Sequence, residues 1–214
     1  MDTWGDRRDA LVSAKIYVEG GGGNAPDSKE LDIRCREGFR RLLQACGFSG
    51  RMPRLVASGG RDATFDSFEV AHRHSGAGEY VAMLIDSENG MADIEAAWAH
   101  LGRRDGWLRP NGATDEQVLL MVTCMETWIV TDHASLQTHY RQGLQQTALP
   151  PLTNMETRDR HAIQDALERA TRDCTNAYRK GVRSFEILGK LKPEVLRQHL
   201  ASFRRCERVL QAKL

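Results

Sequence analysis

Three short apolar runs, separated by two segments with helical periodicity, constrain the fold of this chain most. The runs cover residues 14–18, 54–57 and 80–85, and each is followed by glycines or acidic residues. Between them, apolar residues recur at helical spacing from Ser28 to Gly47 and from about Asp62 to Val70. Strand, helix, strand, helix and strand in this order predict right-handed βαβ units. We therefore expect an α/β fold with a largely parallel central sheet flanked by helices.

The second half of the sequence predicts mostly helices. A helix is expected around 93–101, and apolar stripes at helical spacing run over 163–174 and 196–210. The apolar run 118–130 is ambiguous, because 118–122 suits a fourth strand whereas 124–130 suits the start of a helix. Pro150 and Pro151 break the chain. These features predict a flexible segment over 1–13, an α/β core over 14–150 and a helical C-terminal extension of the same domain over 151–214.

Composition indicates a cytoplasmic globular protein with no membrane partner. The chain has 214 residues, of which 41 % are hydrophobic and 28 % charged, and this is enough for one substantial core. No apolar stretch approaches the roughly 20 residues that cross a bilayer, and residues 1–8 lack the apolar region of a signal peptide. The five cysteines form no C-x-x-C pair, which argues against a disulfide framework and a structural zinc site.

The net charge of +1 conceals an asymmetry along the chain. Residues 178–214 contain ten Lys and Arg against three Glu, a net of +7, so the remainder carries a net charge of −6. A basic C-terminal third could face a polyanion such as nucleic acid. Solvated helix faces explain the same composition, and both interpretations stay open.

Carboxylates follow two of the three apolar runs. Glu19 ends the first run and precedes four glycines, while Asp86 and Glu88 end the third. One residue separates Asp86 from Glu88, so their side chains point to the same side if strand geometry continues. Three carboxylates at adjacent strand ends would repel each other without a cation, and oxygen ligands suit Mg²⁺ or Mn²⁺. A set of surface carboxylates that bind no ligand is the alternative.

The glycine loop after Glu19 permits a different interpretation. Residues 20–25, Gly-Gly-Gly-Gly-Asn-Ala, fit the loose G-x-G-x-x-A pattern of dinucleotide-binding folds. The acidic residue that such folds place after the second strand is missing, because Ser58 and Gly59 follow Ala57. Glu19 would also repel an approaching pyrophosphate. A nucleotide-binding phosphotransferase is therefore kept only as a minor alternative.

The order of these motifs resembles that of a known domain. Two segments, Tyr17-Val18-Glu19-Gly20 and Leu84-Ile85-Asp86-Ser87-Glu88, resemble the TOPRIM signature, in which a Glu after the first strand and a later D-x-D or D-x-E hold Mg²⁺. Together with 28–31, 124–128 and 178–185, they resemble a bacterial TOPRIM-like family of unknown function, related to RloB-type proteins and to the nuclease domains of OLD-family proteins. The resemblance runs from about Lys15 into the last third of the chain.

The resemblance implies a role for several residues. It makes Glu19, Asp86 and Glu88 metal ligands, with Lys180 as the basic residue at the scissile phosphate. Glu30 resembles a glutamate that serves a second metal, although four glycines lengthen its spacing from Glu19. Glu126 resembles a glutamate of RloB-like relatives, and a purely structural Glu126 is the alternative. Arginines in 51–61 and at 103–104 are generic phosphate candidates.

We therefore expect a TOPRIM-like, Mg²⁺-dependent nuclease that cleaves phosphodiester bonds in DNA or RNA. The resemblance further implies an ABC-type or AAA-type ATPase partner and a role in antiviral defence against phage, and it leaves a homo-oligomer open. A non-catalytic TOPRIM-like subunit that docks on an ATPase is the main alternative, because the chain lacks the broad basic footprint of most DNA-binding proteins.

Overall fold

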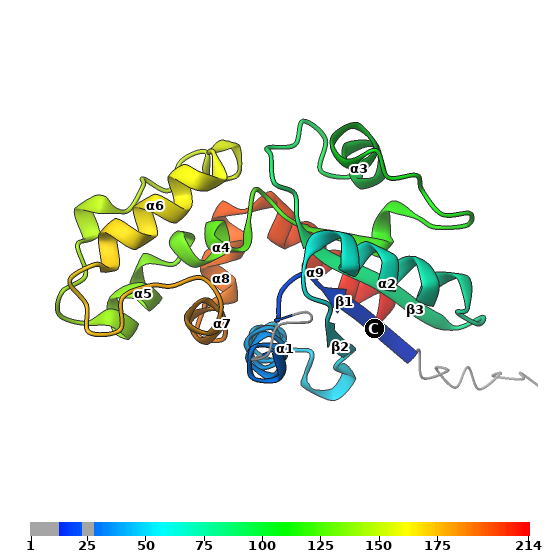
Figure 1. The fold of residues 1–214 in the computed structure, drawn as a ribbon, viewed down its shortest axis with the longest axis horizontal. Helices are drawn as coiled ribbons and strands as arrows, with labels where there is room; N and C mark the ends of the chain where they lie inside the picture. Colours follow the sequence, from blue (N-terminus) through cyan, green and yellow to red (C-terminus); the bar gives the residue numbers. More distant parts are fainter. Residues whose placement is uncertain (1–12, 23–27) are drawn as a thin grey trace, which may run out of the picture.

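A four-stranded parallel sheet forms the centre of the computed structural model, which describes residues 13–22 and 28–214 (Figure 1). The strands are β1 (Ser13–Val18), β2 (Arg54–Ala57), β3 (Glu79–Asp86) and β4 (Val118–Met121). Their order is β2-β1-β3-β4, and all neighbours are parallel. The α/β class with a parallel sheet flanked by helices is thus confirmed, and the arrangement is consistent with a TOPRIM-like fold.

The register brings the carboxyl ends of the strands to one edge of the sheet. Val18 of β1 pairs with Leu84 of β3 on one side and with Ala57 of β2 on the other. Asp86 at the end of β3 pairs with Met121 at the end of β4. Residues that follow β1 and β3 therefore emerge side by side.

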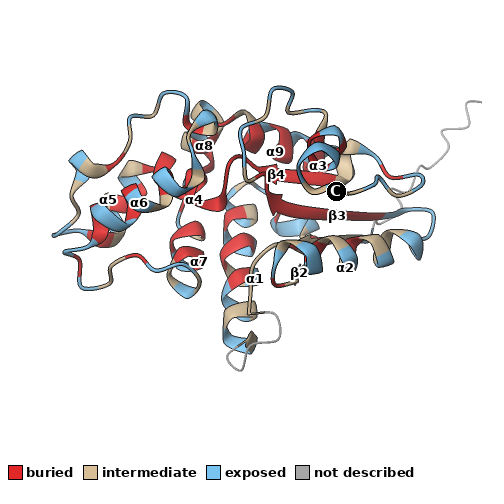
Figure 2. Cartoon of the chain, turned by 45° about the horizontal axis from the view of Figure 1, so that its top comes forward, coloured by how far each residue is buried: buried red, intermediate tan, exposed pale blue. Residues whose placement is uncertain are grey.

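Helices cover both faces of the sheet. Ile16, Leu84 and Leu119 pack with helices α1 (Ser28–Ala45) and α9 (Ala201–Lys213) on one face. Met83 and Leu120 pack with α2 (Arg61–Arg73) and α3 (Ala97–Asp105) on the other. Alternate residues of a strand point to opposite faces, so β3 and β4 are buried on both and are apolar nearly throughout (Figure 2).

The remaining helices form a layer beside the sheet (Figure 1). They are α4 (Met125–Thr131), α5 (His133–Tyr140), α6 (Arg160–Thr171), α7 (Val182–Leu188) and α8 (Pro193–His199). Short 3₁₀ turns lie at Ser49–Arg51, Asp115–Gln117, Gln146–Ala148 and Met155–Thr157. The boundary expected at residue 150 thus falls inside this layer, because α4 packs against α6 and α8, while α9 returns to the sheet.

Two helix boundaries differ from the expected ones because side chains from distant segments cap the helices. The helix expected at 93–101 begins at Ala97, since Asp115 accepts a hydrogen bond from the Trp98 amide at 2.8 Å. The stripe over 196–210 divides into α8 and α9 at Leu200, where Glu156 accepts hydrogen bonds from the first amides of α9, at 2.8 and 2.7 Å. The ambiguous run 118–130 contains both expected elements, β4 and then α4.

The segment expected to be flexible, 1–13, lies outside the described residues except for Ser13, which begins β1. Within 13–22 and 28–214, none of the helices combines the length and the apolar character needed to cross a membrane.

Candidate metal centre

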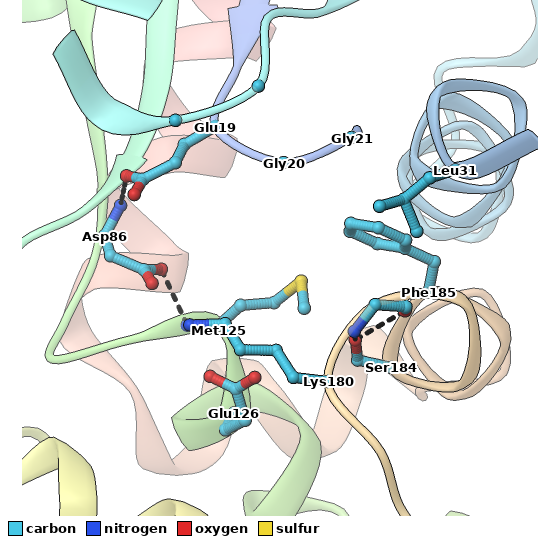
Figure 3. Close-up of a pocket in the computed structure, with 13 residues that line it drawn as sticks. Glu19, Gly20, Gly21, Leu31, Asp86, Met125, Glu126, Lys180, Ser184 and Phe185 are labelled. Carbon is cyan, nitrogen blue, oxygen red and sulfur yellow. Dashed lines mark hydrogen bonds between the residues drawn. The ribbon is translucent and has the colours of Figure 1, made fainter. Parts of the chain in front are cut away.

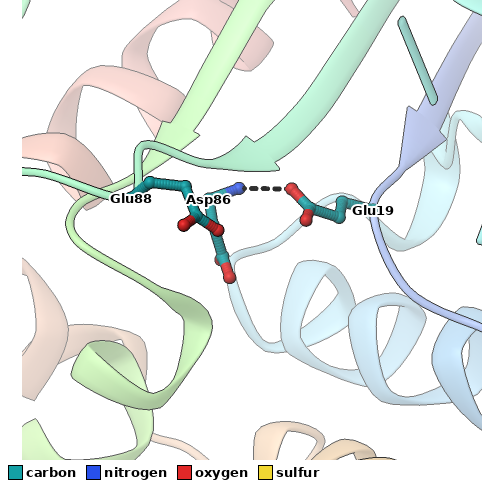
Figure 4. Close-up of side chains that lie close together, drawn as sticks. All are labelled: Glu19, Asp86 and Glu88. Atoms are coloured by element: carbon teal, nitrogen blue, oxygen red, sulfur yellow. Dashed lines mark hydrogen bonds between the residues drawn. The ribbon is translucent and has the colours of Figure 1, made fainter. Parts of the chain in front are cut away.

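Glu19 leaves the sheet at the end of β1, beside β3. Its amide donates to the Leu84 carbonyl at 2.9 Å and so extends the β1–β3 ladder by one residue. The chain then turns at Gly20, whose φ of +135° favours glycine, and a Cβ there would lie 2.9 Å from Cζ of Phe185. Glu19 Oε2 accepts a hydrogen bond from the Asp86 amide at 3.0 Å (Figure 4). The predicted placement of Glu19 at a strand end, with glycines as the turn, is what the structure contains.

Asp86 is the last residue of β3 and is only 8 % exposed. Its Oδ1 accepts a hydrogen bond at 2.8 Å from the amide of Met125, the first residue of α4. Among the described residues, no hydrogen-bond donor contacts Oδ2. The Asp86 carboxylate is therefore oriented through one oxygen and leaves the other for a ligand.

Glu88 lies near Glu19 and Asp86, but the strand geometry expected to position it is absent. Strand geometry ends at Asp86, and Glu88 has a φ of +68°, so the alternation of strand side chains does not orient it. Its amide donates to the Thr123 carbonyl at 2.8 Å. Oxygen atoms of Glu19, Asp86 and Glu88 nevertheless lie within 4.8 Å of one another. We call these three residues the acidic cluster.

Two arginines bind Glu88. Oε2 of Glu88 accepts a hydrogen bond from Arg104 Nη2 at 3.1 Å and forms an ion pair with Nη1 of Arg160. Arg104 comes from α3, and Arg160 is the first residue of α6, so two separate helices supply the two cations. The Glu88 carboxylate is neutralised within the protein.

Arg61, the first residue of α2, lies beside Glu19. Asp105 binds its guanidinium through both carboxylate oxygens, at 3.1 and 2.7 Å, and Trp107 lies under it with the ring centroid 5.0 Å from Cζ. Arg61 donates to the main-chain carbonyl of Asp86, and its Nη1 is 3.8 Å from Glu19 Oε2. Asp105 and Trp107 thus hold a fixed positive charge next to the cluster.

Burial raises the pKa of two of the three carboxyl groups. For Asp86, burial raises the pKa well above its usual value, and the charges of Glu19 and Glu126 add to the effect. For Glu19, burial again raises the pKa and the charge of Glu88 contributes, while the Asp86 amide and Arg61 oppose the rise. A cation between these oxygens would favour their ionised forms.

A cavity of about 340 Å³ opens next to Glu19 and Asp86 (Figure 3). Glu126 and Lys180 line it. The charge of Lys180 opposes the rise in the pKa values of Glu19 and Asp86 that burial causes. Lys180 is exposed and precedes Gly181, the N-cap residue of α7. The structure thus brings the sequence-predicted Lys180 to the same cavity as two of the three cluster carboxylates.

Glu126 lies in the wall of the cavity and is fully buried. The Tyr178 hydroxyl donates to its Oε1 at 2.5 Å, and Gln164 donates to its Oε2 at 3.3 Å. Burial beside this carboxylate raises the pKa of Tyr178 above its usual value. Glu126 is close enough to affect Asp86, but both of its oxygens have protein partners, and it is not part of the acidic cluster.

Glu30 lies away from the cluster. Its side chain is 66 % exposed and pairs with Arg34 one turn further along α1, at 3.4 Å. Glu30, the glutamate expected to serve a second metal, is therefore not part of the acidic cluster.

The first part of the glycine loop is packed against α1. The Gly22 amide donates to Asp32 Oδ1 at 3.0 Å, and a Cβ on Gly21 would lie 2.3 Å from the same oxygen. An anionic phosphate would have to displace the Asp32 carboxylate from this amide. The loop residues 23–27 lie outside the described residues, so the full dinucleotide pattern of 20–25 is not described.

Sequence reasoning missed the partners that distinguish the three carboxylates. Arg160 was not considered, because it lies 72 positions after Glu88 and opens a helix whose apolar stripe was its only recognised feature. The Met125 amide was missed as well, because a backbone donor leaves no pattern in a single sequence. Arg61 and Arg104 were noted as phosphate candidates, and both bind protein carboxylates instead.

Comparison with known proteins identifies the family. A family model described as "Domain of unknown function (DUF4276)" matches residues 28–211. The chain belongs to this family. The match contains Asp86, Glu88, Glu126 and Lys180 and begins after Glu19. No curated protein and no solved structure matches the chain.

Proposed function

We propose that this DUF4276 protein is a metal-dependent, TOPRIM-like nuclease that hydrolyses phosphodiester bonds in nucleic acid with Mg²⁺ or Mn²⁺. One observation carries the proposal: carboxylate oxygens from the ends of two adjacent strands meet within 4.8 Å, beside a cavity that Lys180 also lines. Acidic groups and a lysine around one cavity suit a substrate whose phosphate approaches a divalent cation.

The residues of the acidic cluster fit a hard divalent cation. They offer only oxygen donors, which Mg²⁺ and Mn²⁺ prefer. Burial and mutual repulsion raise the pKa values of Glu19 and Asp86, so the cluster is destabilised when both are ionised and no cation is bound. Glu19 and Asp86 would hold the ion, and Glu88 would contribute once its arginines allow it. Glu30 is not proposed as a ligand.

The bound ion would supply an activated water and polarise the phosphoryl oxygens. The protein groups have separate tasks. The Met125 amide orients Asp86, and the Asp86 amide together with Arg61 orients Glu19. Lys180 is the cation in the cavity wall, and it would neutralise the charge that develops on the phosphate.

Conservative substitutions test the proposal. Glu19→Gln and Asp86→Asn retain an acceptor oxygen for the Asp86 and Met125 amides, so the fold should persist, as circular dichroism would show. Each variant should abolish Mn²⁺-dependent cleavage of single-stranded and duplex oligonucleotides. Glu30→Gln is the matched control, since Glu30 is an acidic residue of the same chain outside the cluster, and it should retain full activity. Undiminished cleavage by Glu19→Gln would overturn the assignment.

A non-catalytic subunit is the second candidate, and one observation favours it. Glu88 is neutralised by Arg104 and Arg160, which weakens the negative field that would attract a cation. Isothermal titration with Mn²⁺ separates the two candidates. Binding that disappears in Asp86→Asn supports the nuclease, whereas absence of binding to the wild type supports a subunit whose role is to dock on another protein.

The ATPase partner and the role in antiviral defence stay predictions from the resemblance. Affinity purification of the tagged protein from its native host, followed by mass spectrometry, would test them. Recovery of an ABC-type or AAA-type ATPase is the expected result, and full activity of a chain that purifies alone would contradict it.

A further inference from the structure

The cavity beside the acidic cluster has two unlike walls (Figure 3). Glu19 and Asp86 lie on one side, where a cation would bind, and Lys180 and the buried Glu126 lie between this side and the opposite one. Leu31 of α1 and Phe185 of α7 lie opposite the two carboxylates, and together with the Met125 side chain of α4 they give the cavity an apolar wall. A metal ion and a phosphate make no use of such a wall. The apolar wall therefore fits another part of the substrate.

The apolar wall is built by close packing of α1 against α7. A Cβ on Gly38 of α1 would lie 2.5 Å from the carbonyl oxygen of Phe185, so glycine permits this approach. At the cavity, Leu31 Cδ1 lies 3.4 Å from the position of a Cβ on Gly181, just before α7. Leu31 and the start of α7 thus limit the width of the cavity opposite the carboxylates.

The dimensions of the cavity favour one nucleotide unit over a double helix. Its volume of about 340 Å³ is near the lower end of the ~300–1,000 Å³ typical of small-molecule pockets. Asp86, which would hold the ion, is 8 % exposed. A single strand can insert one nucleotide into a cavity of this size, whereas a duplex can do so only if that nucleotide is first unpaired and unstacked, which costs free energy. Bases stack on or pack against apolar and aromatic side chains in such sites.

The charge distribution leads to the same conclusion. Proteins that bind duplex DNA neutralise several phosphates with a broad basic surface. Within 178–214, the basic side chains Arg197, Arg205, Arg208 and Lys213 are paired with Glu207, Glu95 or Glu116. With Lys190, which pairs with Glu186, five of the ten Lys and Arg in this segment have a carboxylate partner, which reduces the basic surface that it offers to a duplex.

We propose that the substrate is a single-stranded polynucleotide, which inserts one nucleotide unit into the cavity with its base or sugar against Leu31, Met125 and Phe185. This inference rests on the proposed nuclease function and specifies its substrate. The phosphate of the inserted unit faces Glu19, Asp86 and Lys180. DNA and RNA strands share the chemistry that this wall recognises.

Substrate competition tests the inference. Mn²⁺-loaded wild-type protein is given fluorescent single-stranded DNA, single-stranded RNA of matching sequence, and the corresponding blunt duplexes. At least about tenfold faster cleavage of a single strand than of its duplex is expected, and a comparison of the two single strands identifies the sugar. Cleavage of blunt duplex as fast as single strand would overturn the inference and leave the nuclease proposal intact.

A pair of variants on α1 localises the recognition. Leu31→Asp places a charge on the apolar wall, and Ile33→Asp places it two residues away on an exposed position, 57 % accessible, that does not line the cavity. Leu31→Asp should lower single-strand cleavage at least about tenfold and leave Mn²⁺ affinity within about twofold, whereas Ile33→Asp should change neither. Equal effects of the two variants would contradict the inference.

Measuring binding without hydrolysis distinguishes a failure of the nuclease proposal from a failure of the single-strand inference. Fluorescence anisotropy with Ca²⁺ in place of Mn²⁺ measures the affinity for single-stranded and duplex oligonucleotides. If no oligonucleotide is cleaved, yet single strands bind more tightly and only Leu31→Asp weakens them, the nuclease proposal fails and the substrate class stands. If single strands and duplexes bind equally, or neither binds, the inference fails.

Discussion

The carboxyl end of the sheet contains two acidic regions that differ in their counter-charges. On the cavity side, Asp86 has a backbone amide as its hydrogen-bond partner and Glu19 lies 3.8 Å from one arginine. On the other side, two arginines bind Glu88 directly. The three carboxylates are close together and the side chains of Glu19 and Glu88 are 18 % and 10 % exposed, so the counter-charge, and not burial, distinguishes the two regions. Proximity of acidic residues alone therefore does not identify which of them binds a cation.

The largest expected effect is the difference between neutralising one carboxylate in the first region and one in the second. Asp86→Asn should lower Mn²⁺-dependent cleavage at least about 10³-fold and abolish detectable Mn²⁺ binding. It removes a negative charge that would bind the cation and that no arginine neutralises. Glu88→Gln should cost only about tenfold, since arginines already neutralise that carboxylate. Titration calorimetry and single-turnover cleavage measure both. Equal losses in the two variants would eliminate the distinction between the regions.

The second prediction concerns Lys180 on the cavity side. Lys180→Gln should lower kcat about 10²-fold by removing the charge that faces the phosphate, while Mn²⁺ affinity stays the same or increases. Arg179→Gln is the control, because Arg179 is also exposed and adjacent in sequence but does not line the cavity. A loss of Mn²⁺ binding in Lys180→Gln would show that the lysine supports the metal site instead of the phosphate.

The third prediction changes the Glu88 side. Arg160→Gln removes one of the two cations from Glu88 and so makes the cluster more negative. Mn²⁺ affinity should therefore rise by roughly three- to tenfold, as calorimetry would show. This direction is unusual for the loss of an ion pair, because most such losses weaken a site. A lower affinity would mean that Arg160 positions Glu88 for the metal, and the two regions would then act as one.

Most of the fold was predictable from the sequence because the spacing of apolar residues indicates which side of each helix or strand is buried. The runs at 14–18, 54–57 and 80–85 became β1, β2 and β3, and the order of elements implied parallel pairing. What the sequence did not predict was decided by single long-range contacts. Asp115 starts α3 four residues later than expected, and Glu156 separates α8 from α9. Local patterns contain no information about such partners.

In the candidate site, too, local sequence patterns predicted some positions, and long-range contacts decided the others. The positions of Glu19 and Asp86 could be predicted, because strand ends fix them and parallel strands share an edge. The two-residue spacing of Asp86 and Glu88 predicted their proximity for the wrong reason, since a φ of +68° at Glu88 breaks the strand geometry. Glu30 was expected at the metal from the resemblance alone, and its exposed side chain pairs with Arg34 instead. The arginines of α3 and α6 could not be predicted as partners of Glu88 from the sequence.

The smallest expected effect is thermodynamic and concerns the protein without metal. Burial raises the pKa of Asp86 above the usual 3.8 in the folded state, so the folded protein binds a proton more tightly than the unfolded chain. This contribution stabilises the fold fully below the unfolded pKa and is lost as pH rises through the folded pKa. Near pH 7, well above the unfolded pKa, the buried Asp86 carboxyl group therefore costs stability, and Asp86→Asn, which retains the acceptor for Met125, removes that cost.

Thermal unfolding in the presence of a chelator measures this effect. Near pH 7, Asp86→Asn should raise Tm by a few degrees, since about 1 kcal/mol corresponds to roughly 2–4 °C in a domain of this size. The gain should shrink toward zero as pH falls to about 4, where the wild-type carboxyl is also neutral. Glu88→Gln should show no such gain, because it removes the negative charge that pairs with Arg104 and Arg160. A gain in Glu88→Gln that equals the one in Asp86→Asn would mean that the arginines do not neutralise Glu88, and the cluster would be uniformly short of positive charge.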